Sequence, residues 1–310
     1  MGMTEIFVNL KRFDIPKNFG GLCPLENPIQ WIEDVIEKSV DLGLGEIEGL
    51  NLTYLLPEGL IASASKKLLD SPTEKTQGIQ IGSQGVHWED VSPGGNFGAY
   101  TTSLPASAAK ALGSKWSIIG HSEERKAKMQ IINTYPSLEQ MDSEIAEKTA
   151  LAIDKLVNAE VLCALNVGIN VLLCVGESAL ERGDGDFSEQ KPRIESVLRN
   201  QLMSNLKDVK QFNQKNKIVI GYEPIWAIGP GKTPPGKEYI SFVSNFIQMV
   251  IQENFGFTPV VVYGGGLKEE NAMMIGNINS IGGGLVALTR FTGEIGFDVP
   301  GLKGIIESYP

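Results

Sequence analysis

The sequence predicts an α/β protein in which short strands alternate with amphipathic helices along the whole chain. Three observations support this fold class: β-rich runs recur from end to end, apolar stripes with helical spacing lie between them, and no Pro/Ser/Gly-rich linker divides the 310 residues. We expect eight strands, at Glu5–Asn9, Glu46–Leu52, Ile79–Ser83, Trp116–Gly120, Val171–Val175, Ile218–Tyr222, Val260–Tyr263 and Gly284–Ala287.

The helices between these strands are indicated by end signals and by apolar stripes. Pro28 precedes a stripe that Gly43 closes, and Pro105 and Gly113 bracket another helix in the same way. Two further stripes occur, at Ile194, Val197, Leu198, Leu202 and Leu206 and at Phe242, Val243, Phe246, Ile247, Val250 and Ile251. The stretch Ser137–Gly168 is longer than one crossover helix needs, so we expect an added helix or a break there.

Two architectures accommodate eight parallel strands joined by right-handed helical crossovers. The strands can close into a (β/α)8 barrel, a fold of roughly 250 to over 400 residues, or form an open, doubly wound sheet. Gly49 lies inside the second expected strand, where glycine weakens the β pattern. Periodicity alone does not separate the two architectures.

The charge balance limits the possible partners. The chain has 27 Lys and Arg against 37 Asp and Glu, so its formal charge of −10 disfavours a nucleic acid or an acidic membrane as partner. Cys23, Cys163 and Cys174 are too few and too scattered for a disulfide framework. No run reaches about 18 uninterrupted apolar residues. We therefore expect a soluble, cytoplasmic protein.

Several catalytic motifs are incomplete. Gly231-Lys232-Thr233 resembles the end of a phosphate-binding P-loop, but Trp226 occupies the place of its first glycine. No G-x-G-x-x-G follows a strand, which argues against a dinucleotide cofactor. Gly120-His121-Ser122 begins a nucleophile elbow that Glu124 interrupts. The histidines and cysteines lack zinc-ligand spacing, so we expect no metal site.

Polar residues follow several expected strands, at the end where parallel α/β folds collect their functional groups. Lys11 follows the first strand, although a single lysine there is usually a solvated loop charge. His121, Ser122 and Glu123 follow the fourth strand at a helix start, where outward amides favour a neutral imidazole. A capping turn with a structural histidine would show the same residues.

The later strands carry a carboxylate and a glycine cluster. Glu223 ends an apolar strand, where a carboxylate is costly unless it is solvated or used. The Gly/Pro-bounded segment after it, up to Pro235, can form a lid or an ordinary surface loop. Val260–Gly266 opens into glycines whose amides can approach an anion, as in a plain tight turn.

In this order, the segments resemble the triosephosphate isomerase family over nearly the whole chain. The family motifs are N-W-K, G-H-S-E-R-R, C-I-G-E, Y-E-P-V-W-A-I-G-T-G-K and Y-G-G-S-V. Here they stand as Asn9-Leu10-Lys11, Gly120–Arg125 (G-H-S-E-E-R), Cys174–Glu177 (C-V-G-E), Tyr222–Lys232 (Y-E-P-I-W-A-I-G-P-G-K) and Tyr263–Gly266 (Y-G-G-G). The resemblance implies one (β/α)8 TIM barrel over residues 1–310 and favours it over the open sheet.

The resemblance also implies catalytic roles. Glu223 would be the base that moves a proton between two carbons, and His121 the neutral electrophile at the carbonyl oxygen. Lys11 would supply positive charge for the phosphate and the oxyanion, with Asn9 shaping the oxygen site. The supporting residues would be Ser122, Glu123 and Thr101, and Arg125 would be a structural ion-pair partner.

The phosphate contacts depart from the family pattern. Family members grip phosphate with amides of the lid, of the loop after strand seven and of a Gly-Gly pair after strand eight. Gly229 keeps the first of these, and Gly266 replaces the usual serine of the second. The glycine pair aligns with Ala287-Leu288, and Arg290 follows, where an arginine can restore charge through a bidentate contact. We expect Gly229, Gly266, Leu288 and Arg290 to contact substrate.

Two insertions bear on assembly. The loop after strand three, at about 90–102, is longer than the compact dimer-forming loop of the family, although Gly98–Thr101 resembles its G-A-F-T core. A helical insertion is expected at about 126–160. We expect a homodimer or a higher homo-oligomer in which Thr101 reaches a partner's active site.

Three functions fit these observations. The first is interconversion of dihydroxyacetone phosphate and glyceraldehyde 3-phosphate, a reaction of glycolysis and gluconeogenesis. The second is isomerisation of a four-carbon ketose phosphate such as erythrulose phosphate, motivated by Ala287, Leu288 and Arg290. The third is a catalytically inactive barrel that binds a sugar phosphate. None of them calls for a cofactor or a metal, because enolisation needs only a base, an electrophile and an anion site.

Overall fold

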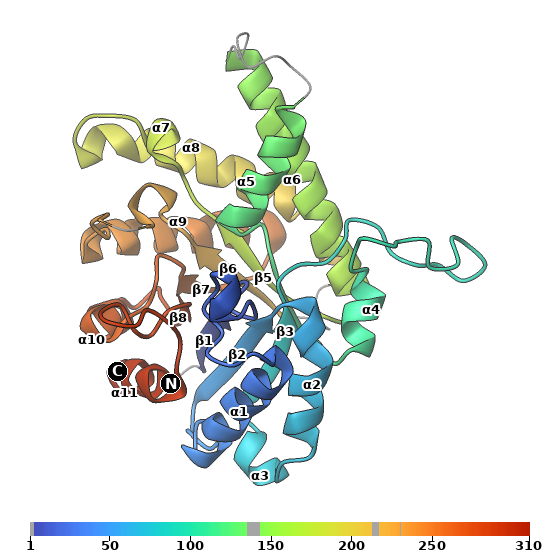
Figure 1. Cartoon of the computed structure of the whole chain (residues 1–310). Coiled ribbons are helices and arrows are strands. Elements are labelled where there is room, and N and C mark those ends of the chain that lie inside the picture. Colours follow the sequence, from blue (N-terminus) through green and yellow to red (C-terminus); the bar gives the residue numbers. More distant parts are fainter. Residues whose placement is uncertain (1–2, 135–142, 213–216, 230) are drawn as a thin grey trace.

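The computed structural model describes residues 3–134, 143–212, 217–229 and 231–310. Eight parallel strands close into a barrel in chain order, and the last pairs with the first (Figure 1). They are β1 (Thr4–Asn9), β2 (Leu50–Leu56), β3 (Ile79–Ser83), β4 (Trp116–Ile119), β5 (Asn170–Val175), β6 (Ile218–Tyr222), β7 (Val260–Tyr263) and β8 (Gly283–Val286). The closed barrel is confirmed, and the open sheet is excluded.

Helices follow the strands and cover the outside of the barrel (Figure 1). The α-helices are α1 (Pro28–Asp41), α2 (Glu58–Leu69), α3 (Thr73–Thr76), α4 (Ala106–Ala111), α5 (Ser122–Ile132), α6 (Ser143–Asn166), α7 (Ala179–Arg182), α8 (Phe187–Asn205), α9 (Lys237–Phe255), α10 (Glu269–Gly276) and α11 (Val299–Glu307). Short 3-10 turns are η1 (Lys17–Phe19), η3 (Val209–Phe212) and η4 (Ile225–Ala227). Local chemistry sets the ends: Asn27 accepts from the amides of Ile29 and Gln30 where α1 begins.

The core has two layers. Inward-facing side chains of the strands fill the barrel, where the rings of Phe7 and Trp116 meet edge to face with centroids 5.0 Å apart. The Trp116 indole keeps its hydrogen bond, to Gln80 Oε1 at 2.6 Å. A larger apolar cluster lies between the strands and the surrounding helices. The packed interior leaves the strand ends as the place for polar chemistry.

The expected position of the second strand was wrong. The strand runs over Leu50–Leu56 and pairs with β1 from Thr4 opposite Leu50, whereas Glu46–Leu52 was expected. Gly49 has a φ of +78° in the turn before the strand, and its carbonyl accepts from the Thr4 amide at 2.7 Å. The glycine therefore marks the start of the strand instead of lying inside it.

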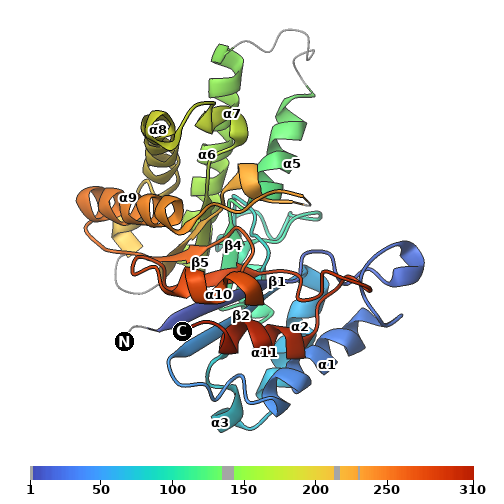
Figure 2. The same ribbon diagram turned by 90° about the vertical axis from the view of Figure 1, so that its left-hand side faces the viewer.

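In the described part of the long segment between β4 and β5, which omits residues 135–142, two helices occur. Figures 1 and 2 show α5 and α6 rising together beyond the barrel. The expected stretch Ser137–Gly168 starts outside the described residues, and from Ser143 to Asn166 it is one helix. The expected insertion at about 126–160 falls on the end of α5 and most of α6. No helix among the described residues is long and apolar enough to cross a membrane.

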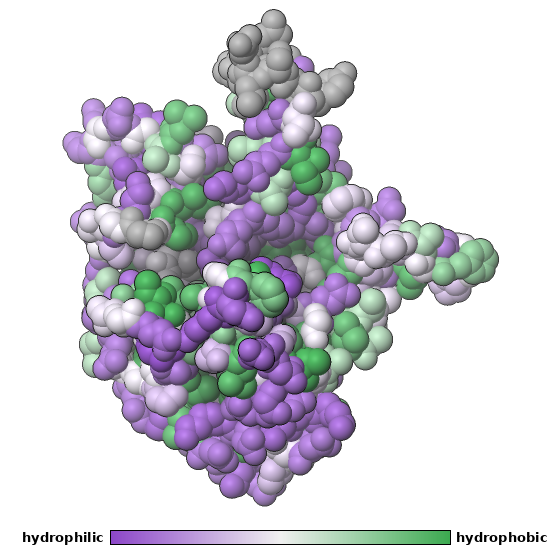
Figure 3. Space-filling model, in the orientation of Figure 1, coloured by the Kyte–Doolittle hydropathy of each residue, from purple (hydrophilic) through white to green (hydrophobic). Residues whose placement is uncertain are grey.

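The loop between β3 and α4 extends far from the barrel (Figure 1). Its base is tied by Asp90, whose carboxylate accepts from the Ser107 amide at 2.9 Å and whose carbonyl accepts from the Tyr100 hydroxyl at 3.0 Å. Apolar surface lies toward its tip (Figure 3), and Phe97 in this loop is 93% exposed. Thr101 lies in this loop and is also exposed.

Candidate active site

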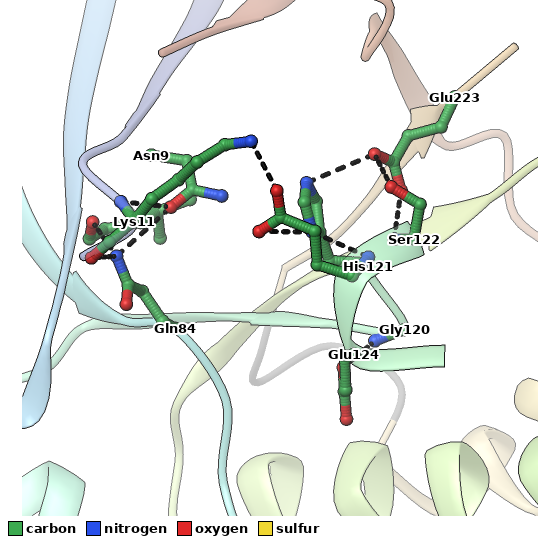
Figure 4. Close-up of polar contacts among 10 residues, drawn as sticks. Asn9, Lys11, Gln84, Gly120, His121, Ser122, Glu124 and Glu223 are labelled. Atoms are coloured by element: carbon green, nitrogen blue, oxygen red, sulfur yellow. Dashed lines mark hydrogen bonds and ion pairs between the residues drawn. The ribbon is translucent and has the colours of Figure 1, made fainter. Parts of the chain in front are cut away.

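Glu223 is the buried carboxylate of the site. It follows β6 and is only 2% exposed. Its Oε2 accepts from the Ser122 amide at 2.9 Å, and its Oε1 accepts from the Ser122 hydroxyl at 3.1 Å and lies 3.2 Å from His121 Nε2 (Figure 4). The Ser122 amide opens α5, so the helix start stabilises the negative charge. The residues that follow β4 and β6 thus meet directly.

Two glycines make room for Glu223. A Cβ at Gly176, after β5, would lie 1.8 Å from the carbonyl oxygen of Glu223. A Cβ at Gly264, after β7, would lie 2.8 Å from Glu223 Cγ. Because β5 and β7 are the neighbours of β6, side chains at either position would push the base out of place. The sequence alone did not connect these glycines with Glu223.

His121 is oriented by the helix that it begins. Its Nδ1 accepts from the Glu123 amide at 3.3 Å. This contact assigns the ring proton to Nε2, because a nitrogen that accepts carries no hydrogen. The Nε2 proton then faces Glu223 Oε1 at 3.2 Å. The ring can therefore donate one hydrogen bond into the mouth of the barrel.

Lys11 follows β1 in a left-handed backbone conformation, with a φ of +41°. This conformation is unfavourable for lysine, and two side chains hold it. Asn9 Oδ1 accepts from the Lys11 amide at 2.9 Å, and Gln84 Nε2 donates to the Lys11 carbonyl at 2.8 Å. The ammonium lies 2.5 Å from Glu123 Oε1 (Figure 4). Gln84 was missed from the sequence, although an amide directly after the third strand was a signal.

Figure 4 shows that Lys11, His121 and Glu223, which are far apart in the chain, lie in one region of the structure. Lys11 pairs with Glu123, the Glu123 amide orients His121, and His121 meets Glu223. Ser122 holds the carboxylate of Glu223 from the same helix start. A cation, a ring donor and a carboxylate are therefore linked in one chain of contacts, and proton transfer beside a carbonyl needs this set of groups.

The expected anion-binding glycines lie at the ends of β6 and β7. Gly229 has a φ of +120° in the segment after η4. Gly266 has a φ of +92°, which disfavours a serine there, and its carbonyl accepts from Asn271 Nδ2 at 3.1 Å. Nearby, the Lys268 ammonium lies 4.0 Å from the centroid of the Phe291 ring. Backbone amides and a cation thus flank this edge of the barrel.

The residues after β8 are engaged with one another. Leu288 is half-buried against the core. The Arg290 guanidinium lies 3.2 Å from Asp298 Oδ2, and the Arg290 backbone forms a bridge with Gly296. Thr101 lies on the extended loop between β3 and α4. The structure therefore brings Asn9, Lys11, His121, Ser122, Glu123 and Glu223 together, and leaves Arg290 and Thr101 outside this contact network.

Glu177 anchors the start of the candidate lid. Its Oε1 accepts from the Tyr222 hydroxyl at 2.9 Å and from the Tyr239 hydroxyl and Trp226 Nε1, both at 2.7 Å. Burial raises the pKa of Glu177 above its ordinary value. The Arg182 guanidinium covers the Trp226 ring at 3.9 Å. Trp226 is thus fixed on both its edge and its face, a role that the sequence did not indicate.

Replacing Trp226 with Phe is expected to loosen this anchor. The ring stays under Arg182, but the hydrogen bond to buried Glu177 is lost, and bonds to charged groups contribute about 1.5–3 kcal/mol. We expect the free energy of unfolding in urea to fall by about that amount and trypsin to cut faster after Lys232. Trp88→Phe, at a half-exposed site, is the matched control. Equal stability of the two variants would contradict the anchoring role.

Among the described residues, no group of three or more His, Cys, Asp or Glu side chains is arranged to hold a metal ion.

Comparisons of the sequence and of the structure with known proteins all find triosephosphate isomerases. The family model for triosephosphate isomerase matches residues 57–294. A triosephosphate isomerase from Alkaliphilus metalliredigens is 33% identical over 211 residues, which are 67% of this chain and 71% of the relative. One from Lawsonia intracellularis is 31% identical over 257 residues, 82% of this chain and 85% of the relative. The crystal structure of a triosephosphate isomerase from Bartonella henselae has the same fold, with a TM-score of 0.61, 22% identity and 92% coverage of both chains.

Proposed function

Because this chain belongs to the triosephosphate isomerase family, we propose that it interconverts dihydroxyacetone phosphate and glyceraldehyde 3-phosphate through an enediolate. One observation carries the proposal: the carboxylate of Glu223 and the ring of His121 lie 3.2 Å apart, and Glu123 of the same helix start holds the Lys11 ammonium. Members of the family are isomerases that act on a sugar phosphate, and these three groups match the needs of that chemistry.

The proton transfer is assigned to Glu223. Both of its carboxylate oxygens are engaged by Ser122 or His121, so one oxygen must leave these partners to reach a substrate carbon. It takes the proton from the carbon next to the carbonyl and returns it to the former carbonyl carbon, while the hydroxyl proton of the first carbon passes to the former carbonyl oxygen. His121 donates from Nε2 to the substrate oxygen as negative charge develops there, and Lys11 stabilises the same charge.

The segment Pro224–Lys232 is assigned to closing the site. It begins at the anchored Trp226, and Gly229 and Gly231 have positive φ values of +120° and +74° that glycine adopts freely. A segment with one end fixed at Trp226 and with glycines further along suits a lid that covers the substrate and excludes water. Exclusion of water protects an enediolate phosphate from losing its phosphate.

One observation favours a second candidate substrate, a four-carbon ketose phosphate such as erythrulose phosphate. Ala287 and Leu288 stand where the family has a glycine pair, and Arg290 is paired with Asp298 in the loop after β8. Bulkier residues at this edge change the approach of the phosphate, while the acid–base groups are unchanged. The residues that indicate the type of reaction, such as Glu223, are therefore separate from those that determine which substrate fits, such as Leu288.

A comparison of substrates tests the proposal. We expect purified protein to convert dihydroxyacetone phosphate with a higher kcat/KM than erythrulose phosphate, measured by a coupled assay for each aldose product. A clear preference for the four-carbon sugar would select the second candidate. Tight binding of both sugars without turnover would identify a binding barrel and refute the enzymatic assignment.

We also propose that the protein acts as a cytoplasmic homodimer. The extended loop between β3 and α4 supports this assembly, because its tip exposes Phe97 and carries apolar surface (Figure 3). Thr101 in the same loop would then reach the partner's site.

A further inference from the structure

Three ionisable side chains, two of them buried and one partly buried, meet between helices α5 and α6. Lys128 on α5 is 9% exposed, and its ammonium contacts the carboxyl groups of Glu124 on the same helix and of Glu160 on α6, the latter at 2.6 Å. Burying charges is unfavourable unless they are paired and hydrogen-bonded. The mechanism above uses none of these groups. Glu124 lies about one helical turn after His121, and this position indicates what the group does.

The group connects to the site through Gly120. Glu124 Oε2 accepts from the Gly120 amide at 2.6 Å, and Arg125 Nε donates to the Gly120 carbonyl at 2.8 Å. Gly120 has a φ of +75° and immediately precedes His121. The side chains of Glu124 and Arg125, in the first turn of α5, therefore bind the amide and the carbonyl of Gly120. Any movement of the Gly120 peptide would rotate the backbone that carries the catalytic ring.

The arrangement has one carboxyl group more than its ammonium can neutralise. Glu160 Oε2 is buried without a hydrogen-bond donor, and the Glu124 carboxylate lies within hydrogen-bonding reach of Glu160. Burial and the charge of Glu124 raise the pKa of Glu160 to about 9. Although burial opposes it, the hydrogen bond from Glu160 and the charge of Lys128 lower the pKa of Glu124. These opposite directions favour the shared proton on Glu160 and keep Glu124 as the acceptor for the Gly120 amide.

We propose that Glu124, Lys128 and Glu160 form a positioning triad that fixes the Gly120 peptide and, through it, the ring of His121. The proposal deepens the isomerase function proposed above and rests on it. Glu124 stands where the family motif has an arginine, so the device belongs to this chain and is not carried over from the motif. None of the three groups meets the substrate; they act through the backbone.

The triad predicts a specific kinetic pattern. Glu124→Ala leaves the Gly120 amide without its acceptor, so the His121 ring loses its set orientation. We expect kcat to fall by about 10²-fold, because small misplacements of a catalytic group have effects of that size. KM should stay within about three-fold, because Lys11 and the glycine amides still bind the phosphate. Glu124→Gln should retain most of kcat, because its carbonyl still accepts from the Gly120 amide and the Lys128 ammonium keeps its contact with Glu160.

Lys128→Met and Lys126→Met make a matched pair. Both remove an ammonium from α5, but Lys126 is exposed whereas Lys128 is buried between the two carboxyl groups. Loss of the Lys128 ammonium leaves the two carboxyl groups with a buried negative charge that has no cation beside it, and this displaces the Glu124 carboxylate from the Gly120 amide. We expect a fall in kcat of about 10-fold for Lys128→Met, within the range seen when buried charge networks are broken, and no change for Lys126→Met.

A spectroscopic readout keeps the proposal separate from the enzymatic one. The chain has two histidines, so the ring nitrogen signals of His121 can be assigned by comparison with a His87→Gln variant. We expect Glu124→Ala and Lys128→Met to shift the His121 signals and Glu124→Gln to leave them in place. Unchanged His121 signals in a folded Glu124→Ala or Lys128→Met variant would overturn the triad. An equal fall in kcat for Glu124→Gln and Glu124→Ala would also overturn the triad. If Glu124→Ala does not fold, the His121 signals and kcat of Lys128→Met provide the test. Absence of turnover in the wild type would instead refute the proposed function.

Discussion

Replacing Glu223 with Gln is expected to lower kcat by about 10²–10⁴-fold, the range attributed to a positioned general base. The substitution preserves size, and the amide carbonyl still accepts from the Ser122 amide that now binds Oε2 at 2.9 Å. The amide cannot take a proton from carbon. We therefore expect KM to change little, since the side chain contributes to the chemical step more than to binding.

Two measurements test this base assignment. The first is kcat for dihydroxyacetone phosphate, with Glu238→Gln as the control because Glu238 is an exposed glutamate on α9. The second is exchange of the substrate's carbon-bound hydrogen with deuterated water, which requires only removal of the proton. Unchanged turnover and exchange in the Glu223→Gln variant would refute the role of Glu223.

The order of the elements could be predicted because local signals, namely apolar periodicity and the residues at element ends, mark most strands and helices. Ile79–Ser83, Ile218–Tyr222 and Val260–Tyr263 were predicted with the bounds that the structure has. The bounds of the second strand were predicted wrongly, because the sequence does not show that Gly49 has a positive φ and ends the turn before the strand. Closure into a barrel depends on β8 pairing with β1, a contact between the two ends of the chain that periodicity does not encode. The family motifs supplied that information, and the barrel is confirmed.

The side chains proposed as catalytic stand at strand ends within specific motifs, so the sequence could single them out. Lys11, His121 and Glu223 lie together as those motifs implied. The residues that hold them were missed for a physical reason. Gln84 and Glu177 act only through partners brought close by the fold, and a single sequence does not show which hydrogen bonds form.

The phosphate side was the least predictable part. Arg290 was expected to contact substrate, because an arginine beside a missing glycine pair suggests a bidentate anion contact. In the structure its guanidinium lies beside Asp298, which also caps the start of α11. Where an arginine points depends on the nearest carboxylate, and Asp298 comes eight residues later in a loop whose path the sequence leaves undefined. Substrate contact by Arg290 stays a prediction.

Replacing Lys11 with Met is expected to lower kcat by about 10²–10³-fold, as loss of one group that stabilises an oxyanion does, and to raise KM for the phosphate ester. The effect on stability should be small. The Lys11 and Glu123 side chains are 35% and 59% exposed, and exposed ion pairs contribute about 0–1 kcal/mol. Lys17→Met is the control, because Lys17 is an exposed cation in the same loop and pairs with Glu294. Equal kinetics of the two variants would show that Lys11 acts only as part of the overall surface charge.

The loss in Lys11→Met has two possible origins, which a double-mutant cycle with Glu123→Gln separates. Without the ammonium, Glu123 is an unpaired carboxylate beside the site and repels a phosphate dianion. If this repulsion causes the loss, adding Glu123→Gln restores kcat/KM. If the ammonium itself stabilises the transition state, the double variant stays as slow as Lys11→Met. We expect the second result for kcat and partial recovery for KM, because repulsion weakens binding of the phosphate whereas the oxyanion needs a positive charge close to it.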